Sequence, residues 1–424
     1  MNPLPPLLVS RFLWLPALAV MAATILFTSP LLSWPVADWA AVSARTHTAV
    51  VYAGPLAAAT SCLLAARFNQ RQSLLASPVL ARAGSRLAAA QFLSCLGTLL
   101  VGYLLGLAPV LADAVTRASW GSLDLLALAS GGADLVGYTA AGYLAGTVLP
   151  SPLLPPIVAL VTFLAIQLPA VTSPDRRSLL TPMDHSPPEA GFHENPTALL
   201  FRIGWFALVA AVGWYTAGLV LADRRPDRRW PGRWALLPPL VPLLAAVVAV
   251  PVLATGPVPD VRPAAYCRDL PVARICLHPA HRSNMDEVAR ITTTLLTLTG
   301  RGGGTSPSPL LVNDQALAGP ATVQLLLPAS QRATDYVAAA LTDLVTGARY
   351  CPEPADDSRH PRQRLADVVA GWLQTRSGVA AENAPYDQDL SPRLAAVPDQ
   401  RVTAWLSTHR TELARCGLTE AALP

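Results

Sequence analysis

Long runs of apolar residues fill roughly the first 250 positions of this sequence and constrain its fold more than any other feature. A helix needs about 20 mainly apolar residues to cross a lipid bilayer. Charged residues make up only 14% of the 424 residues, well below the share of about 25% in soluble proteins. The shortfall lies almost entirely before residue 255. We therefore expect a lipid-embedded part followed by a water-solvated part.

The sequence predicts an α-helical polytopic membrane protein over residues 1–254, with about six or seven transmembrane helices. Seven segments satisfy the length requirement: Phe12–Leu32, Ala49–Ala66, Leu87–Leu111, Leu123–Leu149, Leu153–Val171, Leu199–Leu221 and Ala235–Leu253. Only Pro150-Ser151-Pro152 separates the fourth from the fifth, which predicts a tight turn. A cleaved signal peptide is the alternative for the first segment, but its flanks fit that pattern poorly.

Arginines are concentrated in two of the predicted connections. Residues 67–86 contain Arg67, Arg71, Arg82 and Arg86, and residues 222–234 contain five more. Because basic loops stay in the cytoplasm, we expect a cytoplasmic N-terminus and an extracellular C-terminal domain in a bacterial plasma membrane. All 31 basic residues are arginine, which is typical of a high-GC genome. No basic tract with interleaved aromatic residues indicates a nucleic-acid partner.

Four of the six cysteines lie after residue 255, and they are Cys267, Cys276, Cys351 and Cys416. An even number of cysteines in an oxidising compartment favours disulfides. Four cysteines allow three pairings, and we favour Cys267–Cys276 as a local loop with Cys351–Cys416 as a long-range link. The alternative is four free thiols in a cytoplasmic tail.

Residues 255–424 predict an α+β extracytoplasmic domain. Ser283-Asn284 followed by Asp286-Glu287 predicts a capping box that opens a helix to about Thr299. The sequence also predicts a strand and three further helices, at Thr322–Leu327, Thr334–Thr346, Pro361–Arg376 and Pro398–Arg415. His278-Pro279-Ala280-His281 lacks the His-Glu-x-x-His pattern of a zinc protease, and no nucleophile elbow is present. We therefore expect no metal, no cofactor and no enzymatic activity.

Asp134 falls near the middle of the fourth segment, beside Gly131-Gly132, where we expect a break in the helix. A carboxylate at that depth is costly and usually faces protein or water. Asp134 is therefore either a pathway-lining group or a packing residue that is protonated or hydrogen-bonded.

Two pairs of glycines create faces of small residues on the predicted spans. Gly102 and Gly106 lie in the third segment, and Gly142 and Gly146 lie in the fourth. Small residues let membrane helices approach closely, so the two segments are candidates to pack on each other. Chance in a chain rich in glycine and alanine is the alternative.

Several short motifs resemble permease subunits of type-2 ABC transporters from actinobacteria. They are Val51-Tyr52-Ala53-Gly54-Pro55-Leu56-Ala57-Ala58-Ala59, then Ala65-Ala66-Arg67 with Arg71, and Ile275-Cys276-Leu277-His278-Pro279-Ala280. The resemblance implies a permease subunit of an ATP-driven exporter, paired as a homodimer or heterodimer in the bilayer. It also implies a separate cytoplasmic ATPase subunit, because this sequence has no Gly-x-x-x-x-Gly-Lys-Ser/Thr motif.

By the same resemblance, the 67–86 connection is the ATPase-coupling loop, with Arg67, Arg71, Arg82 and Arg86 at or near the contact. An ordinary positive-inside loop is the alternative. A different function also stays open: a membrane-anchored sensor or scaffold whose outer domain binds an envelope ligand without transport. A hydrolase facing outward is a third, less supported reading.

Overall fold

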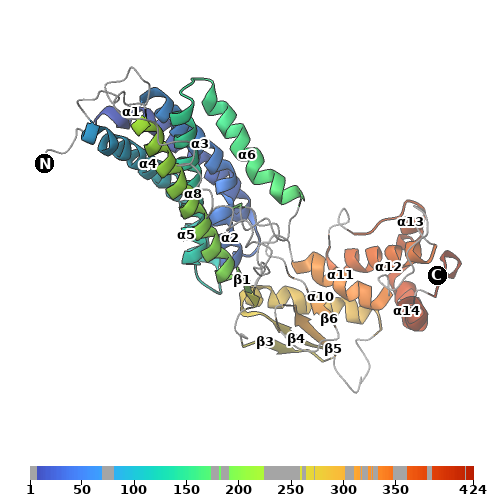
Figure 1. The fold of residues 1–424 in the computed structure, drawn as a ribbon. Coiled ribbons are helices and arrows are strands. Elements are labelled where there is room, and N and C mark those ends of the chain that lie inside the picture. Colours follow the sequence, from blue (N-terminus) through green and yellow to red (C-terminus); the bar gives the residue numbers. More distant parts are fainter. Residues whose placement is uncertain are drawn as a thin grey trace. The chain divides into compact units, whose positions relative to one another are not determined.

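The computed structural model divides the chain into two compact units. The helical unit contains α1 to α8, and the C-terminal unit contains β3 to η9 (Figure 1). The structure describes residues 7–68, 81–172, 181–182, 191–223, 258–259, 264–271, 273–300, 310–315, 317, 323–325, 327, 333–346, 361–379, 384–415 and 417–424. The boundary predicted at residue 255 lies outside these residues.

The helical unit is a bundle in which α1, α3, α4, α5 and α8 run side by side (Figure 1). Its helices are α1 (Leu7–Thr28), α2 (Trp39–Thr48), α3 (Val50–Phe68), α4 (Ala81–Arg117), α5 (Leu125–Val148), α6 (Leu154–Thr172) and α8 (Pro196–Asp223). The short elements are the 3-10 helix η1 (Ser29–Ser33) and the two-residue strands β1 (Phe192–His193) and β2 (Val258–Pro259).

Four described helices are long and apolar enough to cross a membrane. They cover Trp14–Ser33, Trp39–Phe68, Ala89–Arg117 and Pro196–Leu221. The fourth and fifth predicted segments form α5 and α6, joined by the expected short link, and the seventh lies outside the described residues. Large apolar side chains such as Leu15, Leu105 and Leu160 are more than half exposed, as expected of residues that face lipid. Several helices of this unit can therefore span a membrane.

Glycines set how closely these helices approach. A Cβ added to Gly102 or Gly106 would collide with α1, and one added to Gly142 or Gly146 would collide with backbone oxygens of α3. The two glycine faces are thus packing faces, but the prediction that they pack on each other is wrong. The small-residue pattern shows which side of a helix is flat, whereas the partner depends on the order of helices in the bundle.

The C-terminal unit is a four-stranded sheet covered by helices. The strand order is β3 (Tyr266–Asp269), β4 (Ala273–Leu277), β5 (Leu310–Asp314) and β6 (Val323–Leu325). β3 pairs antiparallel with β4, and the other two pairs are parallel. The helical elements are η7 (Pro279–Asn284), α10 (Met285–Leu298), α11 (Ala333–Thr346), α12 (Pro361–Ser377), α13 (Leu390–Ala395), α14 (Asp399–Ala414) and η9 (Glu420–Ala422).

The core of the C-terminal unit follows from the spacing of its apolar residues. Val288, Ile291 and Leu295 recur at helical spacing on α10, and all are buried against the sheet and the other helices. The four predicted helices and the predicted strand are confirmed as α10, α11, α12, α14 and β6. The capping box is wrong, because the N-cap residue Asn284 makes no side-chain capping hydrogen bond.

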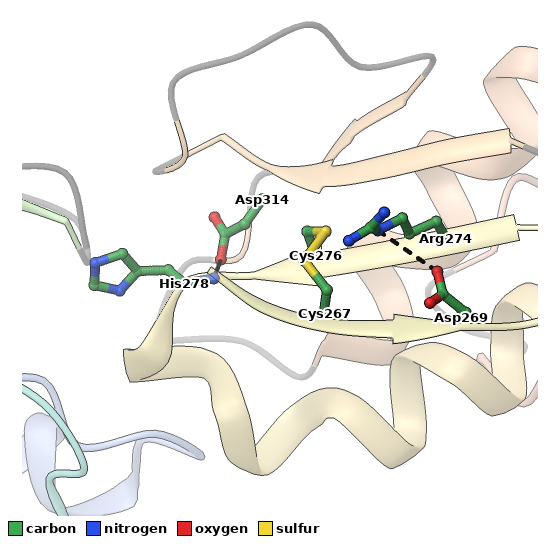
Figure 2. Close-up of a disulfide and its surroundings, with 6 residues drawn as sticks. All are labelled: Cys267, Asp269, Arg274, Cys276, His278 and Asp314. Carbon is green, nitrogen blue, oxygen red and sulfur yellow. Dashed lines mark hydrogen bonds and ion pairs between the residues drawn. A yellow bond between two sulfur atoms is a disulfide. The ribbon is translucent and has the colours of Figure 1, made fainter. Parts of the chain in front are cut away.

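A disulfide joins Cys267 and Cys276 across the β3–β4 hairpin, as Figure 2 shows. The two residues lie directly opposite each other in the antiparallel register, with their Cα atoms 4.1 Å apart. This pair is the predicted local disulfide. The partners proposed for the long-range link, Cys351 and Cys416, lie outside the described residues.

An arginine-centred network joins α12 to the start of α13. The guanidinium of Arg364 lies 3.0 Å from a carboxylate oxygen of Asp387 and 2.9 Å from one of Glu420. The other carboxylate oxygen of Asp387 accepts backbone N–H groups of Asp389 and Leu390. Arg364, followed by the N–H of Leu390, lowers the pKa of Asp387 from its ordinary 3.8 to about 2.

Replacing Gly142 with alanine should destabilise the helical unit, because the added methyl group meets the Ala58 carbonyl. Overpacking of this kind costs about 1–3 kcal/mol. Gly132→Ala on the same helix is the matched control, since nothing lies within 4 Å of a Cβ there. Thermal unfolding of the purified full chain in detergent should show a lower melting temperature for Gly142→Ala only. Equal melting temperatures would contradict the described α3–α5 contact.

The variant Arg364→Gln should be less stable than the wild type in a pH-dependent way. The folded-state pKa of Asp387 is depressed, so its stabilising contribution is complete above the ordinary value of 3.8 and is lost as the pH falls toward about 2. The stability gap between the two proteins should therefore be full at neutral pH and close in that acidic window. Hydrogen exchange of α12 and α13, corrected for intrinsic rates, measures the gap.

The control for this experiment is Arg376→Gln, which removes the exposed pair between Arg376 and Asp399. Exposed pairs contribute little, so this variant should show no comparable gap. If the stability difference between Arg364→Gln and the wild type stays constant as the pH falls into the acidic window, the stabilisation by Arg364 does not come from Asp387.

Candidate functional site

Asp134 lies fully buried in the interior of the helical unit. It is the tenth residue of α5, which places it about 14 Å along the helix from its start. The helix is continuous through Gly131-Gly132, so the predicted break is wrong. Neither carboxylate oxygen of Asp134 has a hydrogen-bond partner among the described residues. Its charge interacts with those of Arg202, His47 and Glu194.

These three residues form a closely spaced group with His47 at its centre. His47 Nε2 lies 2.7 Å from Glu194 Oε1, and Nδ1 lies 3.0 Å from the carbonyl oxygen of Pro182. The Nη1 atom of Arg202 lies 3.0 Å from Nδ1 and 3.3 Å from Nε2. The exposed fractions are 0% for His47, 5% for Arg202 and 9% for Glu194. We call His47, Asp134, Glu194 and Arg202 the buried ionisable cluster.

Contacts with α4 and α5 fix the end of α2, which carries His47. The Asp38 side chain caps α2 by accepting the N–H of Ala40, and α2 ends directly after His47 and Thr48. Tyr103 on α4 donates its hydroxyl to the carbonyl of Thr46. A Cβ on Gly131 would meet this same group, including His47 Cα at 3.0 Å. Glycine therefore lets α5 bring Asp134 against the end of α2.

Two members of the site come from the region between α6 and α8 and from the first turns of α8. Glu194 lies two residues before α8, and Arg202 lies in its second turn. The buried Thr181-Pro182 segment of the same connection supplies the carbonyl that faces His47. Two described parts of this connection, Thr181-Pro182 and Glu194, are thus buried beside His47.

The cluster is chemically unusual for a bundle whose helices can span a membrane. Its described members are two carboxyl groups, one guanidinium and one imidazole, all buried in the helical unit. Ionisable groups at such positions are costly and commonly mark ion or proton pathways. The arrangement can hold, exchange or relay charge. Among the residues that the structure describes, no nucleophile lies against the imidazole, whose nitrogens face Glu194 and Pro182.

Among the predicted site residues whose side chains the structure describes in the helical unit, Asp134 belongs to this cluster. Arg67 lies exposed near the end of α3, while Arg82 and Arg86 lie in the first two turns of α4. Arg71 lies outside the described residues. Arg67 is exposed and is not a member of the buried ionisable cluster, and the role of the four arginines as an ATPase-coupling loop stays a prediction.

Sequence reasoning missed His47, Glu194 and Arg202. Arg202 stood inside the predicted span Leu199–Leu221, and an arginine within a span is a signal equal to that of Asp134. His47 and Glu194 stood just outside predicted spans, where polar residues are ordinary. Only the three-dimensional arrangement shows that they belong to one group.

A second buried polar group lies in the C-terminal unit, at the carboxyl ends of β4 and β5. A carboxylate oxygen of Asp314 lies 2.6 Å from His281 Nδ1. The same oxygen accepts the backbone N–H of His278 at 3.1 Å, and Figure 2 shows Asp314 beside His278. His278 caps η7, since its Nδ1 accepts the N–H of Ala280. Asp314 thereby fixes the turn that leads into α10, which is a structural role.

Neither polar group forms a described metal centre. No set of three or more His, Cys, Asp or Glu side chains in the described part of the chain is arranged to hold a metal ion. At His278 the capping bond also occupies the lone pair of Nδ1, which places the ring proton on Nε2 and disfavours ligation there.

Comparison with known proteins returned no relative: no protein-family model matches the chain, and no curated protein or solved structure is similar to it.

Arg202→Leu should strongly destabilise the helical unit, because it leaves the buried carboxyl groups without their described cation. Loss of one partner of a buried ionic group costs about 3–5 kcal/mol. Adding Asp134→Asn should recover part of the loss, since the amide carries no charge. The melting temperatures of both single variants and the double variant in detergent measure this coupling.

Arg117→Leu is the control for arginine loss, because Arg117 forms an exposed pair with Asp113 one turn away. Its effect should stay within about 1 kcal/mol. If Asp134→Asn gives no recovery in the Arg202→Leu background, the two residues do not share one electrostatic site.

Proposed function

We propose that the chain is the membrane-spanning permease subunit of an ATP-driven ABC exporter that partners a separate ATPase subunit. The observation that carries the proposal is the buried ionisable cluster. A simple anchor gains nothing from charges in its interior, because each one costs desolvation energy. Ionisable residues inside a membrane bundle commonly mark substrate or ion pathways.

The orientation we propose has the N-terminus in the cytoplasm, seven spans in total and the C-terminal unit outside the cell. The Cys267–Cys276 disulfide supports this, because disulfides persist in oxidising compartments. The arginines near the α3 end and α4 start, Arg67, Arg82 and Arg86, then lie on the cytoplasmic side.

The partner we propose is a cytoplasmic ABC ATPase that contacts the 67–86 connection. The chain contains no lysine, so the lysine of a phosphate-binding loop has to come from another subunit. Two permease chains, alike or different, would then form one pathway. The motifs that resemble type-2 ABC permeases support this assembly.

A second function, a membrane-anchored sensor or scaffold, is favoured by a groove on the C-terminal unit. Arg268, Asp286, Arg290 and Thr294 line it, together with Ala289, Thr293, Thr297 and Leu298. Arg268 and Asp286 lie 2.7 Å apart at one of its edges. A groove with charged and hydroxyl groups suits a polar ligand, and this reading requires no ATPase.

The two functions differ in whether ATP hydrolysis accompanies the chain. A tagged full-length chain isolated gently from its native membranes should co-purify with an ATPase. The double variant Arg67→Glu and Arg71→Glu should lose most of that ATPase activity, because charge reversal disrupts a basic contact surface. Arg117→Glu, near the opposite end of α4, is the matched control and should retain it. Wild-type levels of both expression and ATPase recovery in the double variant would exclude the coupling role.

A further inference from the structure

Both ring nitrogens of His47 face hydrogen-bond acceptors. Nδ1 lies 3.0 Å from the Pro182 carbonyl oxygen, and Nε2 lies 2.7 Å from Glu194 Oε1. Arg202 does not form an in-plane hydrogen bond with either nitrogen. The in-plane bonding directions of the two imidazole nitrogens point away from each other, so an atom close to both nitrogens has to lie above the face of the ring. Arg202 Nη1, at 3.0 and 3.3 Å, is such an atom.

This geometry determines how many protons the His47–Glu194 contact holds. A carbonyl oxygen only accepts, so the short contact with Pro182 requires a proton on Nδ1. A second proton has to lie between Nε2 and Oε1, either on the imidazolium or on the carboxyl group. Without it, two lone pairs would face each other at 2.7 Å. The contact therefore contains one proton more than a neutral histidine beside a carboxylate.

The charge of the cluster also favours one added proton, wherever in the set it is bound. Asp134 and Glu194 as carboxylates, Arg202 as guanidinium and a neutral His47 carry a net charge of minus one among the described members. One added proton makes this set neutral, which is the favoured state for charges buried in a low dielectric.

Asp134 is the second group able to take up a proton. It is fully buried, and neither of its oxygens accepts a hydrogen bond from a described residue. An ionised carboxylate is poorly stabilised in such a position. Gly131, one turn before Asp134 on α5, lies against the end of α2, where a Cβ would be 3.0 Å from His47 Cα. Asp134 is therefore close enough for its protonation to respond to the state of the His47–Glu194 contact.

Few other titratable or charged described groups face the cluster. From α4, Tyr103 directs its hydroxyl to the carbonyl of Thr46. On α5, Tyr138 interacts with Asp134 and Arg202. Arg45, on the same helix as His47, lies over the ring of Phe27, 5.1 Å from its centroid.

We propose that the buried ionisable cluster is a proton-binding site, with one exchangeable proton in the His47–Glu194 contact and Asp134 as its coupled carboxyl group. On release, the Nε2–H bond breaks, its electron pair stays on Nε2, and the proton passes by way of Glu194 to water. Glu194 is the most exposed member and precedes α8 in an irregular segment, so it is the point of access. This proposal needs no ATPase and stands independently of the exporter assignment.

The test is infrared difference spectroscopy of the purified full chain in proteoliposomes without ATPase, stepped from about pH 5 to about pH 9 across the ordinary range of histidine. In the unaltered chain, an imidazole signal and a carboxyl signal should change in the same step. Glu194→Gln should remove the shared step, and Asp134→Asn should shift it while removing a second carboxyl signal. Asp113→Asn, at an exposed pair on α4, should leave the step unchanged.

A joint step that survives in Glu194→Gln and is unmoved by Asp134→Asn would overturn the proposal. So would an unaltered chain with no joint imidazole and carboxyl step, an outcome that requires no variant to fold. Neither result would affect the ATPase co-purification, so the proton site and the exporter assignment fail separately.

Discussion

Ionisable side chains buried among apolar helices have to neutralise one another, and this requirement organises the helical unit. His47 from the end of α2, Asp134 from the middle of α5 and Arg202 from the start of α8 share one interior site with Glu194. Buried charges lose most of the stabilisation that water gives to exposed ones. The relative placement of three helices and one connection is therefore tied to the electrostatic balance of four side chains.

Glycines, which have no side chain, stand where the helices approach closely and so allow this placement. Gly131 allows α5 to lie against the end of α2, while Gly142 and Gly146 allow the same helix to lie against α3. Apolar burial supplies little attraction between helices in lipid, so close contact and polar bonds decide their arrangement. α5 contributes to both, because it carries these glycines and Asp134 within one continuous helix.

Much of the element order could be predicted from composition, because a run of about 20 apolar residues has few alternatives to a membrane helix. Asp134 was found for the same reason, as a charge inside such a run. His47 and Glu194 were not, because polar residues near span ends are common and the sequence does not reveal that Glu194 is buried against His47. The glycine faces were predicted correctly, but the helices predicted to pack on them were wrong. The spacing of small residues does not show the order of helices in the bundle.

The local disulfide was predictable because a short spacing between two cysteines limits their geometry. The β3–β4 hairpin that places Cys267 opposite Cys276 was not predicted. Asp314 was also missed, although it lies at the end of a strand with alternating burial. Its role depends on β5 pairing in parallel with β4, a long-range contact that no local pattern encodes.

The proposed proton lies where it affects more than one side chain. The His47–Glu194 contact joins the end of α2 to the segment that begins α8, and Arg202 lies over the same imidazole. Loss of the proton would place an uncompensated negative charge at this junction, and the low dielectric makes such a charge costly unless the helices move or water enters. A site of this kind links protonation to helix arrangement without any additional element. An exporter and a sensor would each gain from that link, because both depend on two arrangements of the same bundle that differ by a few kcal/mol.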